Sequence, residues 1–196
     1  ICETAVTLAK AVNYNSAGTV EFIMGEDKAF YFLEMNTRIQ VEHPITEEVT
    51  GVDLMTLMIQ SGLGEKLTLE QKDISQHGHS IECRICAEDP VSMLPAPGFV
   101  TGLEFTFAQG TRFDHCLFEG YHVTPDFDPM VGKLIVKGFN RDIALRKMRE
   151  SLNGLKIEGL KNNIPLLKQI LKEKNFVMGH YTTNYIYEVK PFEMIQ

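Results

Sequence analysis

The order of apolar and polar residues predicts helices and a hairpin in the first third of the chain. Apolar residues at helical spacing predict a helix over residues 4–15, and turn-forming residues follow it up to Gly18. Alternating runs at 18–24 and 29–36, joined by a turn at 25–28, predict a β-hairpin. A second helix is expected over residues 46–61, with Thr46 as its N-cap and with glycines at 62 and 64 ending it.

The remainder carries more strand signals than helix signals. A polar connection at 67–78 precedes a predicted strand at 80–87, and strand-like runs follow at 99–107, 112–118 and 133–138. Amphipathic patterns predict helices at 141–152 and 164–174, the second with Pro165 in its first turn. We therefore expect an α+β protein of two unequal parts, joined near residues 65–80.

Composition fits an ordinary globular chain. A length of 196 residues is that of one large domain or two small ones. Hydrophobic residues make up 44% and charged residues 23%, which is typical of a soluble globular protein. The net charge of −7 argues against a broad nucleic-acid-binding surface. No apolar run approaches the ~20 residues that cross a bilayer, so we expect a cytoplasmic protein with no membrane partner. Because residue 1 is not Met and lies next to the predicted first helix, we expect the chain to begin inside a longer protein.

Cysteine spacing raises and then weakens the case for a metal or redox site. Cys83 and Cys86 have Cys-x-x-Cys spacing, but they fall in a predicted strand, where positions three apart point to opposite faces. The remaining cysteines, Cys2 and Cys116, do not form a second pair of that kind. We therefore expect Cys83 and Cys86 to be buried structural thiols.

Candidate chemistry is concentrated in residues 30–44. If this segment is extended throughout, Tyr31, Leu33, Met35, Ile39 and Val41 share one face, and Glu34, Asn36, Arg38, Gln40 and Glu42 share the other, flanked by Phe30 and Phe32.

The hairpin register suggests a cation site. With a two-residue loop at Asp27 and Lys28, Glu21 lies opposite Glu34, and two opposed carboxylates repel. A divalent cation between them turns this repulsion into binding, and with the oxygen of Asn36 the set suits Mg²⁺ or Mn²⁺. A longer turn would change this register, and a solvated hairpin with incidental charges is the alternative.

Three side chains beyond the hairpin suggest what the cation site serves. Arg38 offers a guanidinium fork to an oxyanion, Gln40 an amide, and Glu42 a carboxylate base. A metal–phosphate site beside an anion pocket with a base predicts phosphoryl transfer to an oxyanion nucleophile.

The run Glu34-Met-Asn-Thr-Arg-Ile-Gln-Val-Glu-His-Pro44 resembles the signature of biotin carboxylase, the ATP-grasp enzyme of biotin-dependent carboxylases. The resemblance continues, in the family's order, through residues 78–85, 87–90, 95–98, 128–134 and 159–163. It implies three segments. Residues 1–75 would be the C-terminal part of an ATP-grasp core, and residues 191–196 a tail. Residues 76–190 would be the biotin carboxylase C-terminal domain, which is an antiparallel sheet with helices.

The resemblance also implies roles for individual residues. Glu21, Glu34 and Asn36 match ligands of the metal ions of MgATP, and Ile23 matches a contact to adenine. Arg38, Gln40 and the backbone of Val41 match the bicarbonate pocket. Glu42 matches the base that deprotonates bicarbonate for attack on the γ-phosphate of ATP, which gives carboxyphosphate. Arg84 matches the residue that stabilises the enolate of biotin during its carboxylation.

Partners follow from the same resemblance. It implies a biotin carboxyl carrier protein, which presents biotin as the substrate, a carboxyltransferase, and a homodimer with Arg112 in the region of subunit contact. Acetyl-CoA, as in fatty acid biosynthesis, and pyruvate are candidate final acceptors, and the choice belongs to the carboxyltransferase. The family's nucleotide-fold domain and its lid over the ATP phosphates fall outside these 196 residues, so we expect this chain alone to be inactive.

Two departures and two alternatives accompany the resemblance. The hairpin turn is about one residue longer than in the bacterial enzymes, and Asn162 stands where Thr is frequent. Another bicarbonate-using ATP-grasp ligase, similar to the carbamoyl phosphate synthase large chain, is one alternative, which residues 79–90 disfavour. A non-catalytic dimerisation or docking module is the other, which the intact polar set at 34–42 disfavours.

Overall fold

The computed structural model describes residues 1–195. Its contacts divide the chain into two compact units, Ile1–Gln76 and His77–Gln196. Among the described residues, no helix is long and apolar enough to cross a membrane.

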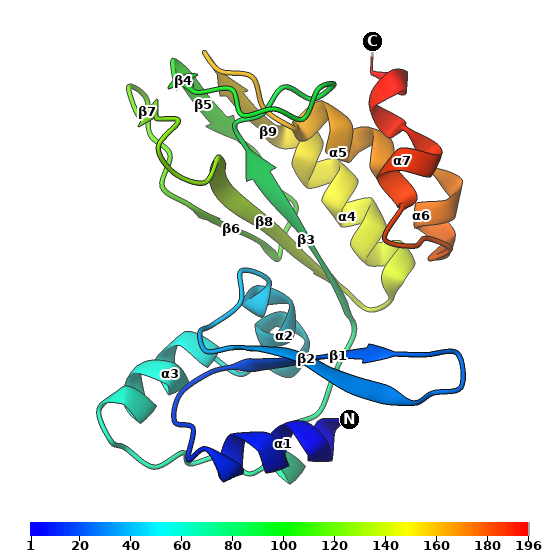
Figure 1. Cartoon of the computed structure of the whole chain (residues 1–196). Helices are drawn as coiled ribbons and strands as arrows, with labels where there is room; N and C mark the ends of the chain where they lie inside the picture. Colours follow the sequence, from blue (N-terminus) through cyan, green and yellow to red (C-terminus); the bar gives the residue numbers. More distant parts are fainter. Residues whose placement is uncertain (196) are drawn as a thin grey trace. The chain divides into compact units, whose positions relative to one another are not determined.

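The first unit combines short helices with a hairpin (Figure 1). Its elements are α1 (Cys2–Ala11), β1 (Thr19–Met24), β2 (Phe30–Asn36), α2 (His43–Thr50), α3 (Leu54–Gly62) and the 3₁₀ turn η1 (Gln71–Asp73). The predicted first helix and the hairpin are confirmed, although α1 ends at Ala11 rather than at residue 15. Glu3 in its first turn and Lys10 in its last turn complement the helix dipole.

The single helix expected over 46–61 is wrong, because Gly51 adopts a left-handed conformation (φ 74°) and ends α2. Asp53 then begins α3, and its Oδ1 accepts a hydrogen bond from the Thr56 backbone N–H at 2.8 Å. Thr46 is not an N-cap, since α2 begins three residues earlier, with Pro44 in its first turn.

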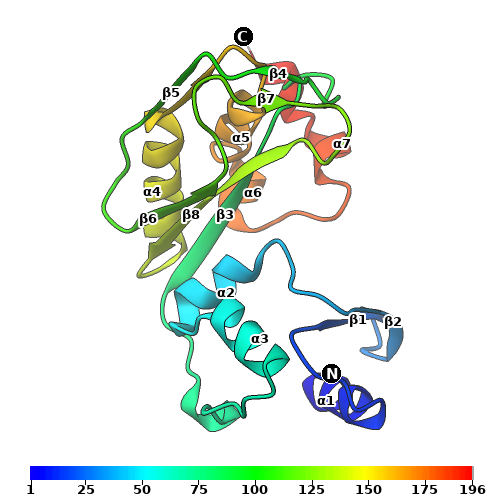
Figure 2. The same cartoon turned by 90° about the vertical axis from the view of Figure 1, so that its left-hand side faces the viewer.

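The second unit is built on an antiparallel sheet with strand order β3-β8-β6. These strands are β3 (His79–Cys86), β8 (Met130–Gly138) and β6 (Thr111–His115); two smaller sheets pair β4 (Gly98–Phe99) with β7 (His122–Val123) and β5 (Gly102–Phe105) with β9 (Leu155–Glu158). Figure 2 shows the long helix α4 (Arg141–Gly154) lying along β3 and β8. It is followed by α5 (Ile164–Ile170), α6 (Lys174–Met178), α7 (Tyr185–Val189) and η2 (Pro191–Met194).

The strands at 80–87, 112–118 and 133–138 and the helix at 141–152 are confirmed within a few residues. The run at 99–107 is not one strand, because β4 and β5 pair with different partners. The helix expected at 164–174 ends at Ile170, and the sequence did not predict the short elements β7, β9, α6 and α7. In the expected tail, Pro191 is buried, and Gln196 lies outside the described residues.

The hydrophobic core lies in the second unit, where α4 packs on the sheet. Ala144, Leu145, Met148 and Leu152 form the buried face of α4. The burial pattern of β3 alternates, so that Ile81, Cys83 and Ile85 face this core while Arg84 is exposed. Packing of the helix on the strands therefore determines which face of β3 is left for chemistry.

We expect Leu152→Ala to lower the free energy of unfolding by about 2–5 kcal/mol, because Leu152 is fully buried and its truncation leaves a cavity. Urea unfolding followed by circular dichroism measures the change. Arg146→Ala on the exposed side of the same helix is the control, with an expected change below about 0.5 kcal/mol. Equal effects of the two substitutions would contradict the packing described above.

Candidate functional site

The register of the hairpin places Glu21 opposite Glu34, as predicted, but by a different route. The loop has three residues rather than two: the Gly25 N–H donates to the Ala29 carbonyl at 2.9 Å, and Lys28 adopts a left-handed φ of 63°. This longer loop shifts the pairing by one residue, and a bulge at Leu33 shifts it back before Glu34 is reached.

The bulge at Leu33 changes which side chains share a face. Phe22 contacts Phe30 and Phe32, with ring centroids 5.5 and 6.4 Å apart, so these three rings lie on one face. Glu21 is adjacent to Phe22 in β1 and therefore points to the other face, with its cross-strand partner Glu34. The expectation that Phe30 and Phe32 flank the polar face is wrong. Tyr31, paired with Ile23, lies on the carboxylate face instead of the opposite one.

One amide joins the two carboxylates. The Asn36 side-chain N–H₂ group donates to Glu21 Oε1 at 2.8 Å and to Glu34 Oε1 at 3.1 Å. Both carboxylates therefore converge on one point within hydrogen-bonding distance. Rotation of this amide by half a turn would present its oxygen there, so the set offers three oxygen donors of the kind that Mg²⁺ prefers. These residues fit a divalent cation.

The strand ends at Asn36, so the alternation expected through residue 42 is wrong beyond that point. Residues 37–42 instead form an irregular connection that leads into α2. Arg38 Nη1 donates to the Ile39 carbonyl at 3.1 Å and to Gln40 Oε1 at 3.3 Å. Val41 follows Gln40 in a turn and is partly buried.

This connection nevertheless gathers the polar side chains in one pocket. Arg38, Gln40 and Glu42 line a cavity of about 470 Å³, together with Thr19 of β1 and His43 of α2. A guanidinium, an amide and a carboxylate around one cavity can bind an oxyanion and accept a proton from it. The turn therefore brings together the three side chains that a continuous strand was expected to align.

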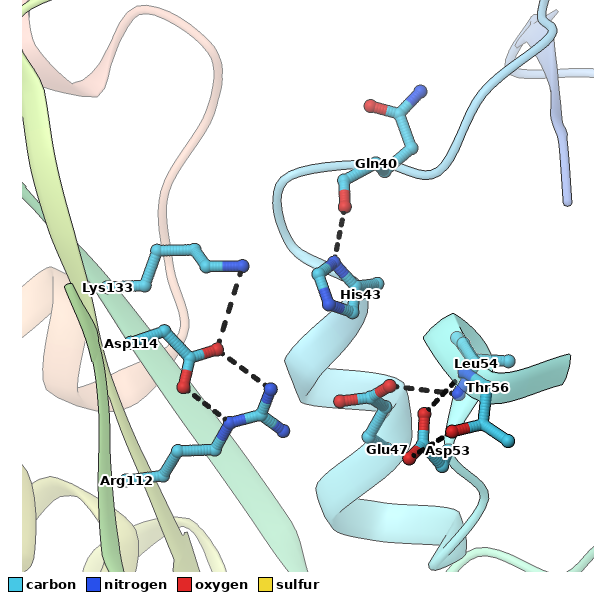
Figure 3. Close-up of polar contacts among 9 residues, drawn as sticks. All are labelled: Gln40, His43, Glu47, Asp53, Leu54, Thr56, Arg112, Asp114 and Lys133. Carbon is cyan, nitrogen blue, oxygen red and sulfur yellow. Dashed lines mark hydrogen bonds and ion pairs between the residues drawn. The ribbon is translucent and has the colours of Figure 1, made fainter. Parts of the chain in front are cut away.

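His43 is a site residue that the sequence analysis did not single out. Its Nδ1 lies 2.7 Å from the Gln40 carbonyl, and its backbone N–H donates to the same oxygen at 3.2 Å (Figure 3). Figure 3 also shows Glu47 accepting from the Leu54 N–H, which ties α2 to the start of α3. Pro44 could have revealed this helix start, since proline favours the first turn.

Arg84 lies in the second unit, on the face of β3 that points away from the core. Its cross-strand partner is Lys133 of β8, and Lys133 is paired in turn with Asp114 of β6. Like charges placed directly opposite each other are unfavourable in a sheet. Asp114 offsets this, because its carboxylate lies 3.9 Å from Lys133 Nζ. The pair of cations makes this face suited to a negatively charged oxygen.

Arg112 supports the same cluster (Figure 3). Its Nε and Nη2 donate to the two oxygens of Asp114 at 2.8 and 2.7 Å, a bidentate pair. Arg112 therefore orients the carboxylate that lies beside Lys133.

The thiols of β3 differ in exposure but share low reactivity. Cys83 is buried, as predicted, whereas Cys86 is only partly buried. Burial raises the pKa of the Cys83 thiol to about 12. Burial, followed by the negative charges of Glu88 and Asp128, raises the pKa of the Cys86 thiol to about 12 as well. Both stay protonated at neutral pH, and a thiol in that state is a poor nucleophile and metal ligand.

Two protein-family models match the chain. "Carbamoyl-phosphate synthase L chain, ATP binding domain" matches residues 1–70, and "Biotin carboxylase C-terminal domain" matches residues 82–188.

Individual proteins resemble nearly the whole chain. Biotin carboxylase 2 of Bacillus subtilis (strain 168) is 46% identical over 186 residues, which cover 95% of this chain and 42% of that protein. The mitochondrial propionyl-CoA carboxylase alpha chain of Caenorhabditis elegans is 45% identical over 192 residues, covering 96% of this chain and 26% of that protein.

A solved structure gives the same picture. The biotin carboxylase domain dimer of the Hydrogenobacter thermophilus 2-oxoglutarate carboxylase, in complex with MgADP, ADP and bicarbonate, matches with a TM-score of 0.92 and 44% identity. The match covers 97% of this chain and 42% of that one. The chain therefore spans about two fifths of the length of the Bacillus protein and of the Hydrogenobacter domain.

We expect Cys83 and Cys86 to react with a disulfide reagent such as DTNB far more slowly at pH 8 than the exposed Cys2 and Cys116 do. Reaction kinetics with mass-spectrometric assignment of the modified residues test this. All four thiols should react quickly in denaturant, which is the control. Rapid modification of Cys86 in the folded protein would contradict the assignment.

Proposed function

The chain belongs to the biotin carboxylase family, and from this membership we propose that it is part of an ATP-dependent ligase that uses bicarbonate to carboxylate biotin on a carrier protein. The observation that carries the proposal is the opposition of Glu21 and Glu34 in the same unit as the pocket of Arg38, Gln40 and Glu42. An opposed carboxylate pair has no structural benefit in a hairpin, whereas it serves metal-bound nucleotide.

Glu21, Glu34 and Asn36 would hold the Mg²⁺ or Mn²⁺ that accompanies ATP. When bound, the metal offsets the charge that develops on the phosphate oxygens. Ile23 lies two residues from Glu21 on the same face of the hairpin, with more than half of its surface exposed. This placement supports its proposed contact to adenine, since an exposed apolar side chain beside the metal ligands offers a surface for the base.

The pocket next to α2 would bind bicarbonate. Arg38 and the amide of Gln40 would hold its oxygens with the backbone of Val41, and Glu42 would accept its proton. The deprotonated oxygen then attacks the γ-phosphorus of ATP, the bond to the β-phosphate oxygen breaks, and carboxyphosphate and ADP result.

Arg84 would act in the second half of the reaction. Carboxyphosphate would break down to CO₂ and phosphate, the released phosphate would accept the N1′ proton of biotin, and N1′ would form a bond to CO₂. The negative charge that develops on the ureido oxygen of biotin would be stabilised by the Arg84 guanidinium. The cross-strand neighbour Lys133 supports this role, because a second cation favours an anionic oxygen on this face.

The wider assignment follows the family. Residues 1–75 would be the C-terminal part of an ATP-grasp domain, and residues 76–190 the biotin carboxylase C-terminal domain. A biotin carboxyl carrier protein and a carboxyltransferase would be the partners of a homodimeric, cytoplasmic enzyme, with Arg112 near the subunit contact. Acetyl-CoA and pyruvate both stay candidates for the final acceptor, and relatives are named for two further acceptors, propionyl-CoA and 2-oxoglutarate.

The two alternatives have less support. The carbamoyl-phosphate synthase model matches only residues 1–70, whereas the relatives at about 45% identity, which span both units, carry the names of biotin-dependent enzymes. A docking module would not require the opposed carboxylates or the polar pocket.

We expect Glu34→Ala and Arg84→Ala to lower biotin-dependent ATP cleavage by about 100-fold or more in the full-length protein that carries this chain. The first removes a metal ligand and the second the stabiliser of the biotin anion. Glu26→Ala in the hairpin turn and Arg146→Ala on α4 are matched controls that should retain activity. Wild-type turnover by the Glu34 and Arg84 variants would refute these roles.

We expect the isolated chain to bind MgATP with a Kd above about 1 mM, because the family's lid over the phosphates lies outside it. Calorimetric titration of the chain, with the full-length protein as the positive control, measures this. Micromolar binding by the chain alone would show that the hairpin and pocket suffice for nucleotide.

A further inference from the structure

We propose that Asn163 is a positioning residue for Arg84, an inference that rests on the role proposed above for Arg84. Asn163 makes three hydrogen bonds to the end of β3. Its side-chain amide donates to the Arg84 carbonyl at 3.0 Å and accepts from the Cys86 N–H at 3.0 Å. Its backbone N–H donates to the Cys86 carbonyl at 3.1 Å. One residue thus serves three backbone groups on both sides of Ile85.

The end of β3 needs this support. β3 lies at the edge of its sheet, with β8 on one side. The pairing with β8 is also interrupted at this point: Ile85 pairs with Gly132, but Cys86 pairs with Met130, so a bulge follows Arg84 by one residue. Because β3 has a neighbouring strand on one side only, the hydrogen bonds from Asn163 act as a short substitute for a second neighbour at its end.

The Asn163 side chain binds β3 instead of capping its own helix. It occupies the N-cap of α5, where an asparagine side chain ordinarily accepts a hydrogen bond from its own helix. Within the described chain, the Asn163 side chain makes no such capping bond. It is turned toward β3 instead and is 8% exposed. The neighbouring Asn162 accepts from the Ile164 N–H at 3.2 Å, so the helix start is served by the adjacent side chain.

The hydrogen bonds from Asn163 affect the direction in which the Arg84 side chain points. The path of an arginine side chain is set by the backbone from which it leaves, and an error of about 1 Å in a reacting geometry can cost a factor of about 100 in rate. Asn163 holds the carbonyl of Arg84 and both the N–H and the carbonyl of Cys86. It would therefore orient Arg84 toward biotin without touching biotin.

Asn163→Ala and Asn163→Asp in the full-length protein test the inference, with Asn162→Ala as the matched control. Asn162 caps the same helix and donates to the Ile157 carbonyl at 3.4 Å, away from β3. We expect Asn163→Ala to lower kcat/KM for biotin at least tenfold while KM for bicarbonate stays within twofold. Asn163→Asp keeps the acceptor for Cys86 but sets a carboxylate oxygen against the Arg84 carbonyl, so its effect should be at least as large as that of Asn163→Ala. Asn162→Ala should leave both parameters within twofold.

A second readout is the order of the Arg84 side chain, measured as the heteronuclear NOE of its Nε–H group. Asn163→Ala should increase the mobility of Arg84, and Asn162→Ala should not. A kcat/KM for biotin within twofold of wild type, an equal loss for biotin and bicarbonate, or unchanged Arg84 mobility would overturn the inference. A wild-type protein without biotin-dependent turnover would instead refute the proposed function, and Arg84 mobility would then decide the positioning role alone.

Discussion

Like charges that face each other across a strand ladder are the constraint on which the candidate residues of each unit depend. Glu21 opposes Glu34 in the hairpin, and Arg84 opposes Lys133 in the larger sheet. Each pair is unfavourable by itself, and each has a compensating partner: the Asn36 amide bridges the carboxylates, and Asp114 lies beside Lys133. The first pair suits a cation and the second an anion, which are the two kinds of group that a metal-dependent carboxylation must stabilise.

The hairpin shows how far a sequence pattern can be followed. The opposition of Glu21 and Glu34 was predicted correctly from a loop of the wrong length, since the longer loop and the bulge at Leu33 offset each other. The faces were not predicted correctly. Strand alternation has a period of two, so one extra residue reverses every assignment beyond it, and nothing in the alternation itself marks where a bulge falls.

Elsewhere, the sequence predicted the elements whose buried residues recur at a regular spacing. It did not predict features that depend on the backbone conformation of one residue or on a contact between residues far apart in the chain. The long helix α4 and the strand β3 pack against one core, so the regular spacing of their apolar residues in the sequence predicts them. The break at Gly51 depends on a left-handed backbone, and glycine also occurs within continuous helices, so its identity alone did not reveal the break. The contact between Asn163 and the Arg84 carbonyl joins residues 79 positions apart, and no local pattern encodes it.

The two units position their candidate side chains by different physical means. Among residues 1–76, Pro44 is the fully buried residue, so Arg38, Gln40 and Glu42 are placed by turns and hydrogen bonds rather than by a core. Arg84, in contrast, lies between Cys83 and Ile85, which are 6% and 0% exposed, so packing fixes the strand on either side of it. At the end of this edge strand, hydrogen bonds from Asn163 add to the packing by holding the Arg84 carbonyl and the Cys86 backbone. Substitutions that spare the core can therefore displace the candidate side chains of either unit without unfolding it.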